Sequence, residues 1–428
     1  MKIKDQIENL IKSLEDEKAT KLWEVCKKII DAVIPHNKLI IAQMSNYDIH
    51  DETHSEKVLE IIEEILGVKI TELTFYELVL IYMSAYLHDS AMAMSEWEYN
   101  VLRAVEGTDQ LHENTLVFYI GNDFKPVHRF SEALKIVKEN KKKFINYDTA
   151  KNYIFIQENE EKVLDFLAKL ICDYEGFRNG YIENLRQFDQ SFSDYYNMSK
   201  MIRSEYIRKT HHIRVVENIS ALERRFCTAL GDRCAQYFTE DLAKICKCHG
   251  EELEKLFTLE LERKDWMGGL SNIQFVAMLL RLGDVIHFSA DRAPLSLFAE
   301  KQITDETSFM HWKAKFQELT YEIYRENDNV CIKYMAYCKE PDIYYFIQDY
   351  LDWVDKEIDN YYILRNRWDV SSRKHMEPYV ISLEMTVNRQ EIKYDEEYFK
   401  PDKDLKFVIN QAKVLDLLTG VQLYKDEY

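Results

Sequence analysis

The sequence predicts a mainly α-helical protein: a helical bundle with a large helical insertion, followed by a smaller α+β C-terminal extension. Three observations support this prediction. Only 11 glycines and 6 prolines occur among 428 residues, and a shortage of turn-forming and helix-breaking residues favours long helices. Apolar residues recur at helical spacing over most of the chain. Alternation of β-branched and aromatic residues, which is typical of strands, begins only after Pro294.

The N-terminal region contains three segments with helical patterns. Apolar positions at helical spacing predict helical structure over residues 1–34, and we expect Pro35 to end it. An amphipathic helix is expected at 58–66, closed by Gly67, because glycine is common just after a helix. Residues 75–88 are apolar almost all round, which predicts a central, buried helix.

The middle of the chain is expected to be helical as well. Residues 92–205 are richer in charged and aromatic residues, and we interpret them as a helical insertion whose lysine run at 141–143 faces solvent. Further helical segments are expected over 203–230 and 271–290, and the second is nearly continuous in apolar residues.

The pattern changes in the last third of the chain. The stretches LTYEIYREND and VCIKYMAYC alternate as strands do, and residues 326–329 are the expected hairpin turn. A helix over about 342–365 and a strand at YVISLEMTV should follow. The predicted organisation is a helical domain over 1–300 with its insertion at about 92–205, an α+β extension over 301–405, and a helical lead-out over 406–428.

Charge and composition disfavour several functional classes. The chain has 56 basic and 75 acidic residues, a formal net charge of −19, which disfavours sequence-independent binding to duplex nucleic acid. Glycine-rich nucleotide-binding motifs are absent, and no apolar run is long enough to predict a membrane span. The eight cysteines lack paired spacing, so we expect reduced thiols and a cytoplasmic protein.

Three separate segments place histidine and aspartate at the edges of apolar helices. Burying a carboxylate there is costly unless it pairs with a cation or coordinates a metal. Imidazole and carboxylate together suit Mn, Fe, Co, Ni or Zn, so we expect one or two divalent transition-metal ions. The residues are His50 and His54 in IHDETH, His88 and Asp89 in AYLHDS, and Asp284 in LLRLGDVIHF, with Arg281 and His287 on its flanks.

A fourth segment, IRSEYIRKTHHIRV, forms a cationic stripe in an otherwise acidic chain. It contains His211 and His212 close to Arg208 and Lys209. Such a stripe can hold phosphate oxygens or bind a second metal through an imidazole. The alternative is a solvated basic helix face that pairs with acidic neighbours.

The segment CKCHG suggests a zinc site formed by Cys246, Cys248 and His249. A structural zinc site usually needs a second pair of ligands at recognisable spacing, and only Cys234 lies nearby. The sequence therefore disfavours this interpretation.

The order of these motifs resembles the HD superfamily of metal-dependent phosphohydrolases. The chain looks most similar to the HD-CE type, an HD domain with a C-terminal extension from bacterial conflict and antiphage systems, often fused to an Hsp90-like ATPase. Many HD relatives have an aspartate where His287 stands, so the surroundings of Asp284 are expected to differ. The resemblance rests on His54, His88, Asp89 and Asp284.

The resemblance implies a role for each matching residue. Asp89 would bridge the ions if two are bound, and catalysis is expected to involve Asp89, His211 and Arg208. The implied metal ligands are His54, His88, Asp89, Asp284 and His211, and the implied phosphate-binding residues are His50, Arg208 and His212.

The implied function is hydrolysis of a nucleotide or single-stranded nucleic-acid phosphate by a metal-activated water, in antiphage defence. The alternative is a non-enzymatic nucleotide sensor or scaffold that regulates an Hsp90-like ATPase. Val414, Leu415, Leu417 and Leu418 in the lead-out need a surface to cover, so we expect an ATPase domain or partner to pack there. A homo-oligomer is also compatible with the sequence.

Overall fold

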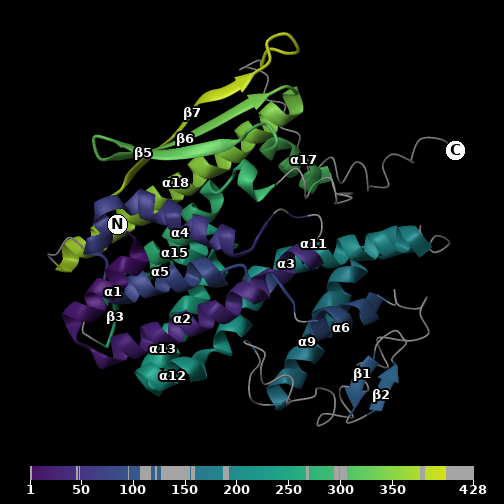
Figure 1. Cartoon of the computed structure of the whole chain (residues 1–428), viewed down its shortest axis with the longest axis horizontal. Coiled ribbons are helices and arrows are strands. Elements are labelled where there is room, and N and C mark those ends of the chain that lie inside the picture. The colour runs from purple at the N-terminus through teal and green to yellow at the C-terminus, as the bar shows by residue number, and fades with distance from the viewer. Residues whose placement is uncertain are drawn as a thin grey trace.

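The computed structural model describes residues 2–401 with several gaps (Figure 1). The gaps are residues 45–46, 48, 95, 107–116, 121–122, 127–154, 156–159, 187–191, 267–268, 294–297, 299–305 and 376–380. The lysine run at 141–143 and the predicted lead-out over 406–428 therefore lie outside the described residues.

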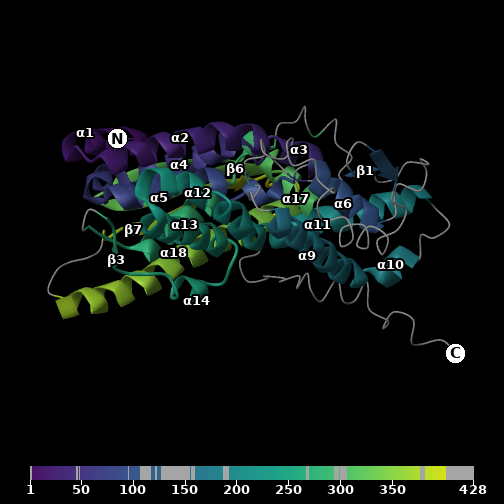
Figure 2. The same cartoon turned by 90° about the horizontal axis from the view of Figure 1, so that it is seen from below.

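Helix α5 (Phe75–Leu87) is the centre of a helical body, as its apolar sequence predicts. Every residue of α5 except Tyr82 is buried. Figures 1 and 2 show the helices that surround it. Those in contact with α5 are α1 (Ile3–Leu14), α2 (Glu17–Asn37), α4 (Glu52–Leu66), α13 (Asp232–Cys248) and α15 (Ile273–Ile286). The prediction of a mainly α fold is confirmed.

Local hydrogen bonds fix where the helices of the body begin and end. In α5 the Thr74 hydroxyl accepts a bond from the Glu77 amide at 3.1 Å, and the Glu77 carboxylate accepts one from the Thr74 amide at 2.9 Å, which is a capping box. Helix α4 begins after Asp51, whose carboxylate accepts from the Thr53 amide at 2.9 Å, and ends at Gly67 as predicted.

Pro35 does not end the first helical region, so that prediction was wrong. Helix α2 continues through Pro35 to Asn37. A proline in the last turn removes only one helical hydrogen bond, and tertiary bonds hold the residues that follow. His36 Nε2 bonds the carbonyl oxygen of Ser90 at 2.9 Å, and Asn37 donates to the carbonyl oxygen of Tyr86 at 3.1 Å.

The insertion projects from one end of the body (Figure 1). It packs together with Ile40 and Met44 in a second hydrophobic core, separate from that of the body. It is mostly helical, as expected, but it also contains an antiparallel hairpin that the sequence reading missed. Helix α11 runs from the insertion into the body, where it packs on α13. The elements are α6 (Glu96–Glu106), β1 (Val117–Ile120), β2 (Asp123–Pro126), α9 (Glu160–Asn179), α10 (Ile182–Arg186) and α11 (Phe192–Ser220).

The C-terminal extension is a three-stranded sheet backed by a long helix. Strands β5 (Thr320–Glu326) and β6 (Asn329–Cys338) form the predicted antiparallel hairpin. Helix α18 (Pro341–His375) then crosses over, so that β7 (Glu384–Tyr394) pairs with β6 in parallel. Figure 1 shows α18 between the sheet and the helical body. Extension and body share one continuous core.

The remaining elements are short. They are α3 (Leu39–Gln43), α12 (Glu223–Leu230), α14 (Leu253–Leu256), α17 (Glu306–Lys315), the 3₁₀ turns Gly67–Glu72, Ser90–Met92 and Ala290–Arg292, and the strand pair β3 (Arg263–Lys264) and β4 (Leu270–Ser271). Among the described residues, no helix has both the length and the apolar character needed to span a membrane.

Candidate metal centre

Five helices of the body bring histidine and aspartate side chains to one place. His54 lies in the first turn of α4, and His88 and Asp89 directly follow α5. His211 lies on α11, His249 directly follows α13, and Asp284 lies in the last turn of α15. These residues form two groups that could each hold a metal ion: the first group is His54, His88 and Asp284, and the second group is Asp89, His211 and His249.

In the first group, two buried imidazoles face one carboxylate. His54 Nε2 lies 3.2 Å and His88 Nε2 lies 3.9 Å from Asp284 Oδ1. Both histidine side chains are almost completely buried, whereas 30% of the Asp284 side chain is exposed. The first group is therefore closed on its histidine side and open on its aspartate side.

Asp89 belongs to the second group, and its carboxylate also faces the histidines of the first group. Its Oδ2 lies 3.2 Å from His88 Nε2 and 3.5 Å from His54 Nε2. Its Oδ1 lies 3.5 Å from His211 Nε2 and 3.7 Å from His249 Nε2. One carboxylate thus lies between two sets of imidazole nitrogens, which is the geometry of a bridging ligand.

The tautomers of the histidines fit a cation. His88, His211 and His249 each place Nδ1 on the carbonyl oxygen of the residue three positions earlier. A carbonyl only accepts, so Nδ1 carries a proton, and in the neutral imidazole Nε2 keeps its lone pair. The Nε2 atoms of His211 and His249 lie 2.9 Å apart. Two lone pairs at that distance repel each other unless they share a cation.

The buried Nε2 atoms of the first group also fit a cation. Those of His54 and His88 make no hydrogen bond to any residue that the structure describes. Buried polar atoms are nearly always bonded, so an orphaned pair directed at two carboxylates calls for an explanation. A divalent ion held by imidazole and carboxylate would supply it. The donor set therefore fits a transition metal.

Burial and charge shift the pKa values of these groups in opposite directions. Burial lowers the pKa of His88, but Asp89 and Asp284 outweigh it and raise the pKa to about 9. Burial and the neighbouring histidines lower the pKa of His211 to about 3 and that of His249 to about 4. Near neutral pH the second group therefore offers neutral imidazoles, while the carboxylates attract a proton to His88.

Comparison with protein families identifies the fold that carries this geometry. The model of the HD-CE family matches residues 44–360, which include all six residues of the two groups. The chain belongs to the HD-CE family. No curated protein and no solved structure matches the chain. The similarity to HD-CE proteins that the motifs indicate is confirmed.

His287 and Asp291 extend the centre of this HD-CE protein behind His54. His54 Nδ1 and His287 Nδ1 lie 2.8 Å apart, and His287 Nε2 lies 3.4 Å from Asp291 Oδ1. If His54 keeps Nε2 for a metal, its Nδ1–H donates to His287, whose remaining proton then faces Asp291. Such outer partners fix the orientation of metal-binding histidines.

The predicted phosphate-binding residues lie around the two groups rather than in them. His50 accepts a 2.6 Å hydrogen bond from Arg292, and its ring lies 5.5 Å from that of His54. Arg208 is half-exposed and donates to Glu205 at 2.6 and 2.8 Å. His212 packs against Gly250, where a Cβ atom would come within 2.8 Å of the imidazole side chain.

His249 is the residue that the sequence reading missed. In CKCHG the two cysteines suggested a zinc site together with His249. Within the described residues neither Cys246 nor Cys248 belongs to a candidate metal group. The useful signal was a histidine directly after the last residue of a helix, which is also the position of His88.

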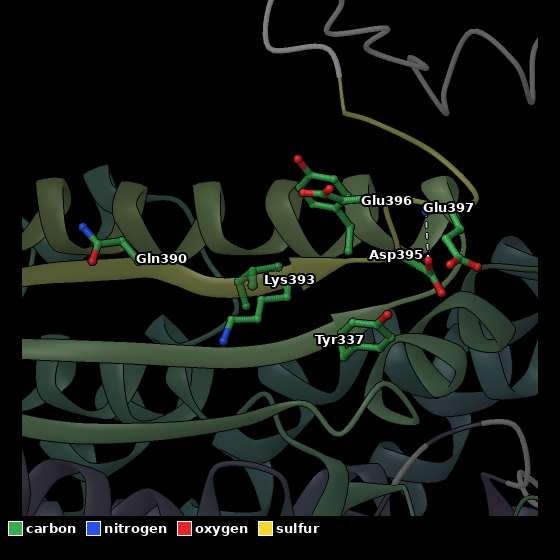
Figure 3. Close-up of a pocket in the computed structure, with 8 residues that line it drawn as sticks. Tyr337, Gln390, Lys393, Asp395, Glu396 and Glu397 are labelled. Carbon is green, nitrogen blue, oxygen red and sulfur yellow. Dashed lines mark hydrogen bonds between the residues drawn. The ribbon is translucent and has the colours of Figure 1, made fainter.

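A separate pocket lies at the end of β6 and β7, in the extension (Figure 3). Its lining includes Tyr337 and Lys393 together with the carboxylates of Asp395, Glu396 and Glu397. The Asp395 side chain accepts a bond from the Glu397 amide at 3.1 Å, so this acidic turn is partly held by its own hydrogen bonds. The lining contains no histidine and differs in chemistry from the candidate metal centre.

Proposed function

We propose that this HD-CE protein is a metal-dependent phosphohydrolase or phosphodiesterase that acts on a nucleotide or nucleic-acid phosphate. The observation that carries the proposal is the position of Asp89 between the two groups. In this proposal the first and second groups hold one divalent transition-metal ion each, and Asp89 bridges them. Bound ions would polarise the phosphate and lower the pKa of an attacking water.

The exposure of the side chains supports a direction of substrate approach. Asp284 and His211, with 30% and 14% of their side chains exposed, are the most accessible members of the two groups. A phosphate would therefore enter between them, while the buried histidines exclude water from behind. Arg208 lies on α11 one turn before His211 and would contribute a charge-assisted contact to phosphate oxygens, assisted by His50 and His212.

The charge of the chain supports a small substrate. A net charge of −19 repels a long phosphate backbone, whereas a single nucleotide needs only a local cationic pocket. As the resemblance to HD-CE proteins implies, we further propose a setting in bacterial antiphage defence in the cytoplasm, with an Hsp90-like ATPase as a further domain or partner.

The proposal is tested with the purified chain, stripped of metal and reloaded with Mn, Co or Ni, against nucleoside triphosphates, cyclic nucleotides and short oligonucleotides. We expect hydrolysis by the parent protein. Asp89→Asn should lower turnover by more than about 100-fold, because bound ions supply several kcal/mol of transition-state stabilisation.

A matched control is Asp241→Asn. Asp241 is also buried, but it pairs with Arg263 at 2.7 and 2.8 Å, outside both groups. This variant should lose stability and keep its turnover. Full turnover by Asp89→Asn would contradict the proposal. A parent protein that binds metal and hydrolyses nothing on the panel would instead favour the nucleotide sensor.

A further inference from the structure

Arg281 connects α15 to two other parts of the molecule. It lies one turn before Asp284 and is buried. Its Nε and one terminal nitrogen donate to the two carboxylate oxygens of Glu357, at 2.9 and 2.6 Å. The other terminal nitrogen donates to the carbonyl oxygen of Cys248 at 2.7 Å and also to that of Glu251. One guanidinium thus joins a carboxylate to two backbone carbonyls.

The two carbonyls lie on either side of His249. Helix α13 ends at Cys248, whose carbonyl oxygen accepts only a long bond, 3.4 Å, from the Glu251 amide within the same turn, so it has room for a stronger donor. Arg281 supplies that donor and ties both ends of the turn from Cys248 to Glu251 to α15. Since His249 belongs to the second group, the position of its imidazole depends on this turn.

Glu357 comes from the C-terminal extension. It lies on α18, and its side chain is 5% exposed. Two more bonds attach α18 to α15: the Tyr350 hydroxyl donates to the carbonyl oxygen of Val285 at 3.0 Å, and Trp368 Nε1 donates to Gln274 at 3.0 Å. The extension thus contacts α15 along its whole length, with Glu357 beside the candidate metal centre.

We propose that Glu357 is a positioning residue, which acts through Arg281 to hold His249 in place for metal binding by the second group. This inference rests on the metal centre of the proposed function and adds a role for the extension. Without the carboxylate, the buried guanidinium has no partner for its charge and moves to satisfy it. The carbonyls around His249 then lose their donor. Asp284 stays in a continuous helix, so the first group is affected less.

The test is a titration of the metal-free full chain with Mn²⁺. Calorimetry measures the binding phases, and electron paramagnetic resonance measures the state of the bound ions. His249→Ala identifies which binding phase belongs to the second group. In Glu357→Gln we expect this phase to weaken by at least about tenfold, as is typical when outer partners of metal ligands are removed. The other phase should be unchanged. At equal Mn²⁺, the spectrum should shift from spin-coupled pairs to isolated ions, which a general loss of stability would not produce.

Two further variants test the link between Glu357 and His249, one at Arg281 and one as a control. Arg281→Lys retains the charge and loses the bidentate contact, so it should weaken the same phase even if Glu357→Gln does not fold. Asp241→Asn breaks another carboxylate–arginine pair, in which Arg263 of β3 donates to Asp241 of α13. Asp241 lies eight residues before His249 and about 12 Å away along the helix. This substitution should lower the melting temperature and leave Mn²⁺ binding unchanged.

The outcomes separate this inference from the proposed function. Two Mn²⁺ phases that are the same in the parent, Glu357→Gln and Arg281→Lys would overturn the inference and leave the metal centre standing. Absence of Mn²⁺ binding by the parent protein would overturn both.

Discussion

The imidazoles of His88, His211 and His249 are oriented by the same kind of hydrogen bond. Each Nδ1–H donates to the carbonyl oxygen three residues earlier, and each Nε2 faces Asp89. The environments nevertheless differ. Asp89 and Asp284 overcome the effect of burial on His88 and raise its pKa to about 9, whereas burial lowers the pKa of the other two. Proton and metal therefore compete mainly at His88.

This competition predicts that metal binding releases a proton. At a pH below its pKa of about 9, His88 is protonated in the metal-free protein. A metal ion must displace that proton to reach Nε2. Affinity should rise with pH up to this value, with about one proton released per centre near pH 7. Calorimetry in buffers of different ionisation enthalpy measures the release.

The pH dependence identifies the group. Release from His88 should decrease above its pKa of about 9, whereas release from a metal-activated water would increase as the pH rises. Binding heats that do not depend on the buffer would contradict the prediction.

At the scale of the element, α4 shows how a metal-binding helix is held at both ends. Asp51 caps its N-terminus next to His54. At its C-terminus, Gly67 has φ +57° and ψ −124°, a conformation that side chains with a Cβ atom rarely adopt. Arg325 of β5 donates to the carbonyl oxygen of Ile65. The helix therefore depends on a glycine and on the extension for its last turn.

Gly67→Ala should destabilise the protein by about 1–3 kcal/mol, because the backbone conformation is strained for alanine. The new Cβ would also lie 2.9 Å from the Arg325 guanidinium. The control is Gly176→Ala in α9, where the new Cβ would meet nothing within 4 Å beyond its neighbours and its own helix backbone, so alanine should stabilise the helix by about 1 kcal/mol. Urea denaturation measures both. Equal effects of the two substitutions would contradict this account of Gly67.

At the scale of the whole molecule, the helical body and the extension form one unit. Large side chains of α18 belong to the same core as those of α4, α5 and α15. Hydrogen bonds at Arg281, Gln274 and Val285 also join α15 to α18. The insertion, by contrast, has a separate core, where Glu106 accepts from Tyr174 at 2.7 Å and from Arg203 at 3.0 Å.

Removal of the extension should therefore unfold the body. A chain cut after residue 300 loses the buried α18 residues Leu351, Val354, Ile358, Tyr361 and Leu364. Deleting so many core side chains costs more than about 10 kcal/mol, comparable with the whole stability of a domain. We expect a loss of near-ultraviolet circular dichroism and binding of a hydrophobic dye. A truncated chain that unfolds cooperatively with a native near-ultraviolet spectrum would show the two parts to be independent.

Sequence reasoning worked where the signal is local. The central helix, the stop at Gly67 and the β5–β6 hairpin follow from neighbouring residues, and the structure has all three. It failed where tertiary contacts determine where an element ends or which element forms. Pro35 stays within α2 because His36 and Asn37 bond to distant carbonyls, and the insertion contains a hairpin beside its helices.

The sequence alone determined the fold class and selected His54, His88, Asp89 and Asp284 as candidates, because a charge on an apolar helix is visible from nearby residues and costly to bury. His211 was selected from the cationic stripe and from the resemblance to HD proteins. Only the tertiary structure decided that His249 joins them, that Asp89 faces two groups, and that Glu357 contacts Arg281. These relations join residues far apart in the chain. They depend on how the helices cross and pack, which no local pattern encodes.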